Sequence, residues 1–262
     1  MSNQPIGVFD SGVGGTSIWK EIQKLLPNEN TIYLADSKNA PYGEKSQEEI
    51  LQLSIKNTDL LLEKGCKIIV VACNTATTNA ISYLRANYNL PFIGIEPAIK
   101  PAALQSESKI VGVLATKGTL SSSLFNSTSE NHANGIKIIE QEGTGLVPLI
   151  ENGKVDAEET RELLNTYVAP MLDQGMDCLV LGCTHYPYLI PTLKSILPDH
   201  VKIIDSGEAV ARQVKAILEK NDILNTSEKI VRHQFYTNVS PEVLHNFVEG
   251  VAQNISVGQL DF

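Results

Sequence analysis

The chain has 262 residues, 42% of them hydrophobic, with a formal net charge of −9 and a sequence pI near 5.1. This length can bury one large core or two modest ones. The acidic balance, without any cluster of Lys or Arg, argues against a nucleic-acid partner, because phosphate binding needs a basic patch.

Two further classes are also disfavoured. No apolar run approaches the length of a membrane span. The first residues run into an apolar strand without the charged and apolar regions of a secretory signal. We therefore expect a cytoplasmic protein with no membrane partner.

In chain order, strands alternate with helices. The first part predicts a strand at 6–9, a Gly-rich turn, a helix at 16–26 and a strand at 31–35. A capping box, Ser46 with Glu49, opens a helix that ends at Gly65. An apolar strand that ends at Cys73 follows, and then a helix at 76–87 and a strand at 92–95.

The second part repeats this alternation. It predicts strands at 110–114 and 136–139 separated by a helix, and then a helix from 156 to about 174. A second apolar strand ends at Cys183 and leads to a helix ending near 197, a strand at 201–204 and a helix at 206–220. Ser240 and Pro241 mark one more helix start. Such alternation is typical of βαβ units and parallel sheets, so the fold class is α/β.

The two cysteine segments belong to a weak internal repeat, because each is followed by a helix, a short strand and a polar turn. We therefore expect two pseudo-symmetric parallel-sheet α/β domains, with the active site in the cleft between them. The first domain comprises residues 1–97 plus 207–262, and the second comprises 98–206. Ligands of open α/β sheets bind beyond the carboxyl ends of the strands, where both cysteines lie.

The chemistry of the two segments is similar. Cys73 precedes Asn74 and Thr75, and Cys183 precedes Thr184 and His185. A thiol between a strand and a helix N-terminus lies where free N–H groups favour the thiolate. Two matched thiols suit a reaction in which a proton leaves one face of a carbon and returns on the other. Four cysteines without C-x-x-C spacing indicate reduced thiols, and Cys66 and Cys178 are interpreted as small buried hydrophobes.

The first Gly-rich turn, residues 10–15, has two interpretations. Gly12 and Gly14 after a strand, with Asp36 at the end of the next strand, resemble part of a dinucleotide-binding fingerprint. Against this, position 17 is Ser where the motif has Gly or Ala, and Asp10 would place a negative charge beside the pyrophosphate. The favoured interpretation is a carboxylate-binding turn, in which backbone N–H groups and Ser11 hold an anionic substrate and Asp10 assists acid/base chemistry.

Four separated motifs, in the same order, resemble the glutamate racemase family. They are residues 10–15 (DSGVGG), 41–43 (PYG), 72–76 (ACNTA) and 182–187 (GCTHYP). The resemblance spans about residues 6 to 220, and residues 235–237 are similar to the tail of the family. It implies a racemase that interconverts L- and D-glutamate without a cofactor or metal, supplies D-glutamate for peptidoglycan, and forms a homodimer.

The resemblance also implies roles for individual residues. Cys73 is the base for D-glutamate and Cys183 the base for L-glutamate. Asp10 and His185 assist them, and the fit of residues 147–151 makes Glu151 a candidate partner of His185. The implied substrate contacts come from both halves of the chain: Asp10, Ser11, Pro41, Tyr42, Gly43, Asn74, Thr75, Thr116, Thr184 and His185.

One departure from the family pattern lies near Glu151, where Gly143, Thr144 and Gly145 replace a common Cys-Pro pair. Because of this departure, the resemblance does not predict the conformation of the loop beneath Glu151. Two other functions remain as alternatives: a nicotinamide oxidoreductase, which leaves both cysteine segments unexplained, and a carboxylate-binding protein without turnover.

Overall fold

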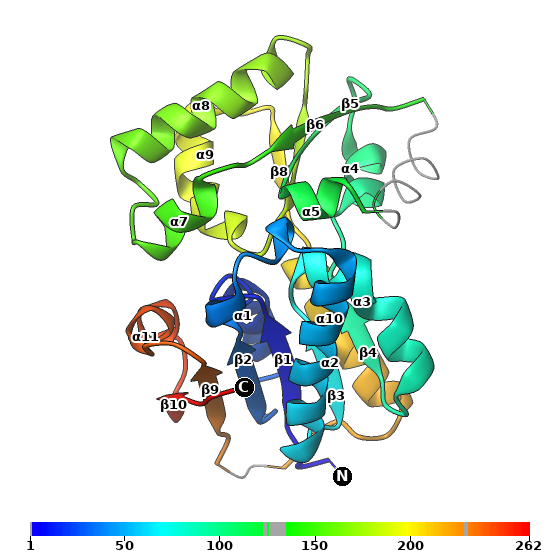
Figure 1. Ribbon diagram of the computed structural model, residues 1–262. Helices are drawn as coiled ribbons and strands as arrows, with labels where there is room; N and C mark the ends of the chain where they lie inside the picture. The colour runs from blue at the N-terminus through cyan, green and yellow to red at the C-terminus, as the bar shows by residue number, and fades with distance from the viewer. Residues whose placement is uncertain (1, 123–124, 126–134, 228–229) are drawn as a thin grey trace. The chain divides into compact units, whose positions relative to one another are not determined.

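The computed structural model describes residues 2–122, 125, 135–227 and 230–262. The chain divides into two compact units (Figure 1): unit 1 comprises Met1–Ile95 and Gly207–Phe262, and unit 2 comprises Glu96–Ser206. The chain therefore leaves unit 1 once and returns to it once.

Unit 1 is built on a sheet of six parallel strands in the order β10-β9-β2-β1-β3-β4. Their bounds are β1 Ile6–Asp10, β2 Thr31–Ala35, β3 Ile68–Val71, β4 Phe92–Gly94, β9 His233–Thr237 and β10 Ile255–Gln259. The strands β1, β2 and β3 are buried at every position, as expected when helices cover both faces of a parallel sheet.

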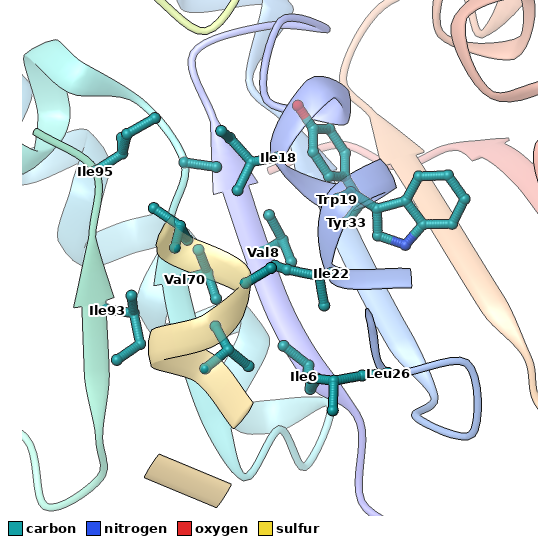
Figure 2. Packing of buried hydrophobic residues seen from close by; sticks show 14 of the residues in the cluster. Ile6, Val8, Ile18, Trp19, Ile22, Leu26, Tyr33, Val70, Ile93 and Ile95 are labelled. Atoms are coloured by element: carbon teal, nitrogen blue, oxygen red, sulfur yellow. The ribbon is translucent and has the colours of Figure 1, made fainter. Parts of the chain in front are cut away.

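The helices of unit 1 are α1 Thr16–Leu25, α2 Gln47–Glu63, α3 Asn74–Asn87, α10 Gly207–Lys220 and α11 Glu242–Val248, with 3₁₀ turns η1 Ser37–Asn39 and η2 Tyr42–Glu44. The capping box expected at Ser46 and Glu49 is present. Ile6 and Val8 of β1 point toward α1 and α10 and lie beside Ile22 of α1 (Figure 2), whereas Trp19 of α1 packs on Phe235 of β9. Gly7 faces the opposite side and leaves room there for Cys66.

Unit 2 is built on a sheet of four parallel strands in the order β6-β5-β7-β8. Their bounds are β5 Ile110–Ala115, β6 Lys137–Glu142, β7 Cys178–Gly182 and β8 Lys202–Ile204. The helices are α4 Ile99–Gln105, α5 Lys117–Leu120, α7 Leu146–Glu151, α8 Glu158–Leu172 and α9 Ile190–Ile196, with the 3₁₀ turn η3 Tyr186–Leu189. Ala102 of α4 and Phe125 pack on Val113 and Val180 of the sheet.

The same strand order recurs in both sheets. Strands β2-β1-β3-β4 of unit 1 correspond in order to β6-β5-β7-β8 of unit 2. Strands β3 and β7, which precede the two cysteines, are therefore equivalent, and so are β1 and β5. The expectation of two parallel-sheet α/β domains is confirmed.

Among the described residues, the sequence did not predict the strands β9 and β10, the short helices α4 and α7, or the 3₁₀ turns η1 and η2. The expected helix between 114 and 136 is described only at α5, because residues 123–124 and 126–134 lie outside the described residues. Over the part of the chain that is described, no helix is both long enough and apolar enough to cross a membrane.

Candidate active site

Cys73 lies where β3 gives way to α3, at the N-cap of that helix. Its sulfur accepts the N–H of Ala76 at 3.4 Å, and its thiol lies 3.6 Å from the hydroxyl of Ser11. The side chain is 5% exposed. An N–H donor of the first helical turn and the positive end of the macrodipole both favour a thiolate here.

Asp10 ends β1, the strand next to β3. Its buried carboxylate accepts the N–H of Gly15 at 2.8 Å, and the hydroxyl of Tyr33 donates to the carbonyl of Gly12 at 2.8 Å. A Cβ on Gly15 would lie 2.8 Å from both the Cβ of Asp10 and the hydroxyl of Tyr33, so this turn requires glycine. The Gly-rich turn is thus held in one conformation, with the hydroxyl of Ser11 beside the thiol of Cys73.

Tyr42 is anchored by the carboxylate of Asp36. The hydroxyl of Tyr42 donates to Asp36 Oδ2 at 2.5 Å, and the amides of Asn39 and Asn238 donate to Asp36 Oδ1 at 2.8 and 2.6 Å. Burial, and next the charge of Asp36, raise the pKa of Tyr42 far above its usual value, so the hydroxyl remains a donor. The carboxylate of Asp36 therefore already accepts three hydrogen bonds from side chains of this protein. This disfavours a role for Asp36 in accepting hydrogen bonds from the ribose of a dinucleotide.

The negative charge of a Cys73 thiolate also contributes to the raised pKa of Tyr42. The turn η2 also contacts α3, the helix that begins directly after Cys73. Tyr42 is buried within η2, Gly43 is half-buried, and Pro41 is the exposed N-cap residue.

Asn74 carries an unusual side chain. It is 3% exposed, and neither its amide nitrogen nor its amide oxygen has a hydrogen-bond partner. Buried amides are almost always paired, because an unpaired polar atom costs about 1–3 kcal/mol. Asn74 comes directly after Cys73 and beside Thr75, which is 4% exposed. A polar ligand bound beside the thiol of Cys73 could form hydrogen bonds with the amide of Asn74.

In unit 2, Cys183 follows β7 and faces a histidine. Its sulfur lies 3.9 Å from His185 Nδ1, and His185 Nε2 lies 2.8 Å from a carboxylate oxygen of Glu151. A carboxylate can only accept, so the neutral ring carries its proton on Nε2 and presents the Nδ1 lone pair to the thiol. Glu151, expected only as a candidate partner of His185, does contact it.

The segment after Cys183 differs from the expected helix. It forms the 3₁₀ turn η3 and then the short α9, because Pro187 and Pro191 lack the N–H groups that a continuous helix needs. Thr184 is buried at this turn, and Thr116 follows β5 at the position equivalent to Ser11 after β1. The two thiols therefore have different neighbours: a helix N-terminus at Cys73 and an imidazole at Cys183.

The remaining thiols are buried structural residues. Burial raises the pKa of Cys66 to about 12 and that of Cys178 to about 11, so both stay protonated at neutral pH. Among the residues described, no three His, Cys, Asp or Glu side chains form a group that could hold a metal ion.

Sequence reasoning missed several residues that support these sites. Asn57 donates to the hydroxyl of Tyr42 at 3.1 Å, and Tyr186 donates to the carbonyl of Gly143 at 3.1 Å. The position of Asp36 at the end of a strand was a usable signal, since that edge of the sheet carries the other polar side chains. Asn57 gave no local signal, and Gly143 stood out only as part of the departure from the family pattern.

Two parallel-sheet α/β units, each with a cysteine and polar side chains after an equivalent strand, define the class of protein as an amino-acid isomerase. The profile of the Asp/Glu/Hydantoin racemase family matches residues 6–214, and the chain belongs to this family. The resemblance drawn from the four motifs is thus confirmed, as is the prediction of an amino-acid racemase.

Individual relatives are similar over nearly the whole chain. The glutamate racemase of Ectopseudomonas mendocina (strain ymp) is 51% identical over 227 residues, 86% of either chain. The structure of Escherichia coli glutamate racemase in complex with L-glutamate and the activator UDP-MurNAc-Ala has a TM-score of 0.88 at 32% identity, covering 98% of both chains. The glutamate racemase of Francisella tularensis subsp. tularensis SCHU S4, in complex with D-glutamate, has a TM-score of 0.84 at 29% identity over 98% of both chains.

Proposed function

We propose that this chain interconverts L- and D-glutamate with two cysteines, Cys73 and Cys183, as the bases. The observation that carries the proposal is the equivalent placement of the two thiols, each after the corresponding strand of a sheet with the same order. Relatives that hold L-glutamate and D-glutamate support the choice of substrate.

The substrate carboxylate needs donors, because the α-proton of an amino acid is a very weak acid. Removing it requires hydrogen bonds that strengthen as charge develops on the carboxylate, with water excluded. The unpaired amide of Asn74 and the hydroxyls of Ser11 and Thr75 are suitable contacts on the side of Cys73. Thr116, Thr184 and His185 are the proposed contacts from unit 2, and the turn of Pro41, Tyr42 and Gly43 supplies more from unit 1.

Each thiol would act in one direction. With D-glutamate, Cys73 as thiolate takes the α-proton, with Asp10 assisting, while Cys183 as thiol delivers a proton to the other face. With L-glutamate the roles reverse, and His185 Nδ1, 3.9 Å from the sulfur, takes the thiol proton of Cys183. The charge of Glu151 at 2.8 Å stabilises the imidazolium that results.

The proposal extends to the location, the oligomeric state and the cellular role of the protein. We propose a cytoplasmic homodimer that supplies D-glutamate for peptidoglycan synthesis. The two thiols provide both acid/base groups, so the proposal requires no cofactor.

The test is circular dichroism of each enantiomer with the purified protein. Either enantiomer should lose its signal as the mixture approaches equal amounts, and Cys73→Ala and Cys183→Ala should each abolish this. Cys66→Ala and Cys178→Ala are matched controls for Cys73→Ala and Cys183→Ala, respectively, because each removes a thiol from the same unit that lies away from the carboxyl ends of the strands, and both should remain active.

Other outcomes would identify the alternatives. Turnover in Cys73→Ala or Cys183→Ala would refute the two-thiol assignment. Binding of glutamate without optical change would favour a carboxylate-binding protein. Stabilisation by a nicotinamide dinucleotide in a thermal-shift titration would favour the oxidoreductase.

A further inference from the structure

The short helix α7 is held at both ends by two consecutive residues of the turn after Cys183. At its C-terminal end, Glu151 bonds to His185 at 2.8 Å. At its N-terminal end, the hydroxyl of Tyr186 donates to the carbonyl of Gly143 at 3.1 Å. Tyr186 is fully buried, and its own N–H donates to the carbonyl of Cys183 at 3.1 Å.

Gly143 cannot be another residue without moving this tyrosine. A Cβ at position 143 would lie 2.2 Å from the hydroxyl oxygen of Tyr186 and 2.8 Å from its Cζ. The N–H of Gly143 donates to the carbonyl of Ala115 at 3.0 Å, which joins the turn to the end of β5. The absence of a side chain at Gly143 therefore lets Tyr186 reach the turn.

A second tyrosine bonds to the same turn from a different element. The hydroxyl of Tyr167, on α8, donates to the carbonyl of Thr144 at 2.6 Å. Tyr167 is more exposed than Tyr186, and it lies on α8, outside the turn that carries Cys183 and His185. Tyr167 is therefore a matched comparison for Tyr186. Its hydroxyl donates to the carbonyl of Thr144, next to that of Gly143, but Tyr167 is not adjacent to His185 in the chain.

We propose that Gly143 and Tyr186 are positioning residues that fix α7 so that Glu151 holds His185 in the tautomer with its Nδ1 lone pair toward Cys183. The proposal rests on the proposed function for its kinetic consequence, but the geometry itself can be tested without turnover. When the bond between Tyr186 and Gly143 is lost, α7 gains freedom at its N-terminal end. The bond between Glu151 and His185 then loosens, and the Nδ1–H tautomer becomes populated.

The first measurement is long-range ¹H–¹⁵N NMR of the histidine rings at neutral pH. The signals of His185 are identified by their loss in His185→Asn. The wild type and Tyr167→Phe should show the Nε2–H tautomer at His185. Tyr186→Phe should show a mixture of both tautomers.

The second measurement is kinetic. Tyr186→Phe should lower kcat with L-glutamate about tenfold with KM changed less than twofold, because the perturbed group orients a base rather than binding substrate. Tyr167→Phe should change kcat less than twofold. Gly143→Ala should resemble Tyr186→Phe, and if that variant does not fold, Tyr186→Phe alone decides.

The inference is overturned if Tyr186→Phe matches Tyr167→Phe in both His185 tautomer and kcat. A wild-type protein without turnover of either enantiomer would instead refute the proposed function. In that case the tautomer comparison still decides whether Tyr186 positions His185.

Discussion

A buried ion pair, Lys67 with Glu29, makes a strong prediction about the stability of unit 1. Lys67 Nζ lies 2.6 Å from Glu29 Oε2, and it donates to the carbonyls of Ser2 and Ile223 at 2.7 and 2.8 Å. The other oxygen of Glu29 accepts the N–H of Asn225 at 2.8 Å. The two side chains are 2% and 1% exposed, so both charges depend on these partners.

Replacing the lysine alone leaves a buried carboxylate without its counter-charge. Loss of one partner of a buried pair costs about 3–5 kcal/mol, against a total stability of about 5–15 kcal/mol. Lys67→Met should therefore lower the free energy of unfolding by about 3–5 kcal/mol. Adding Glu29→Gln removes the unpaired charge but keeps an acceptor for Asn225, so the double variant should recover at least about 2 kcal/mol.

The assay is urea unfolding at pH 7 followed by the fluorescence of Trp19, the single tryptophan, which reports unit 1. The control is Lys24→Met, which breaks a 3.7 Å surface pair with Glu21. The lysine of that pair is 79% exposed, so its loss should cost about 0.5 kcal/mol or less. A loss in Lys67→Met no larger than in Lys24→Met, or a double variant less stable than the single, would refute the reasoning.

Three other predictions concern the proton-transfer groups and pH. His185→Asn should reduce kcat and change the isotope effect mainly with L-glutamate, and Asp10→Asn mainly with D-glutamate; equal changes in both directions for both variants would refute these separate roles. The purified protein should show no visible absorbance and should keep its activity after dialysis against a chelator. A loss of activity that pyridoxal phosphate or a divalent metal restores would contradict this. Burial lowers the pKa of His233 to about 4 from an ordinary 6.5, so the folded state binds fewer protons and its stability should fall as pH drops from about 6.5 to about 4. Trp19 fluorescence in urea measures that dependence, which His233→Gln should reduce; an unchanged dependence would contradict it.

The parts of the fold that local patterns determine could be predicted from the sequence. The capping box of Ser46 and Glu49 and the apolar runs of β1, β2, β3 and β7 placed helices and buried strands within a few residues. The strand β9 was missed because its position depends on pairing with β2, so that His233 lies opposite Thr31. No local pattern contains a partner so distant in the chain. Short α7 was missed because six residues with an internal proline carry little helical periodicity.

The residues of the candidate site also fall into two groups, those that a local sequence pattern identifies and those that only the folded structure brings together. The thiols and the polar residues after them are adjacent in the sequence, so the motifs identified them. The anchors are not adjacent: Asn238 bonds to Asp36 across 202 positions, and Tyr186 bonds to Gly143 across 43. Such contacts follow from the packed fold, and Gly143 could be understood only once the ring of Tyr186 was placed against it.

The central claim, that one thiol removes the α-proton and a different thiol delivers one, is tested most directly in deuterated water. Thiol protons exchange quickly with solvent in the open enzyme. Early product should therefore carry deuterium at the α-carbon, while the remaining substrate should carry almost none. Mass spectrometry of each separated enantiomer at low conversion measures both. Substantial protium in the early product, or rapid deuterium uptake into the starting enantiomer, would contradict the two-thiol mechanism.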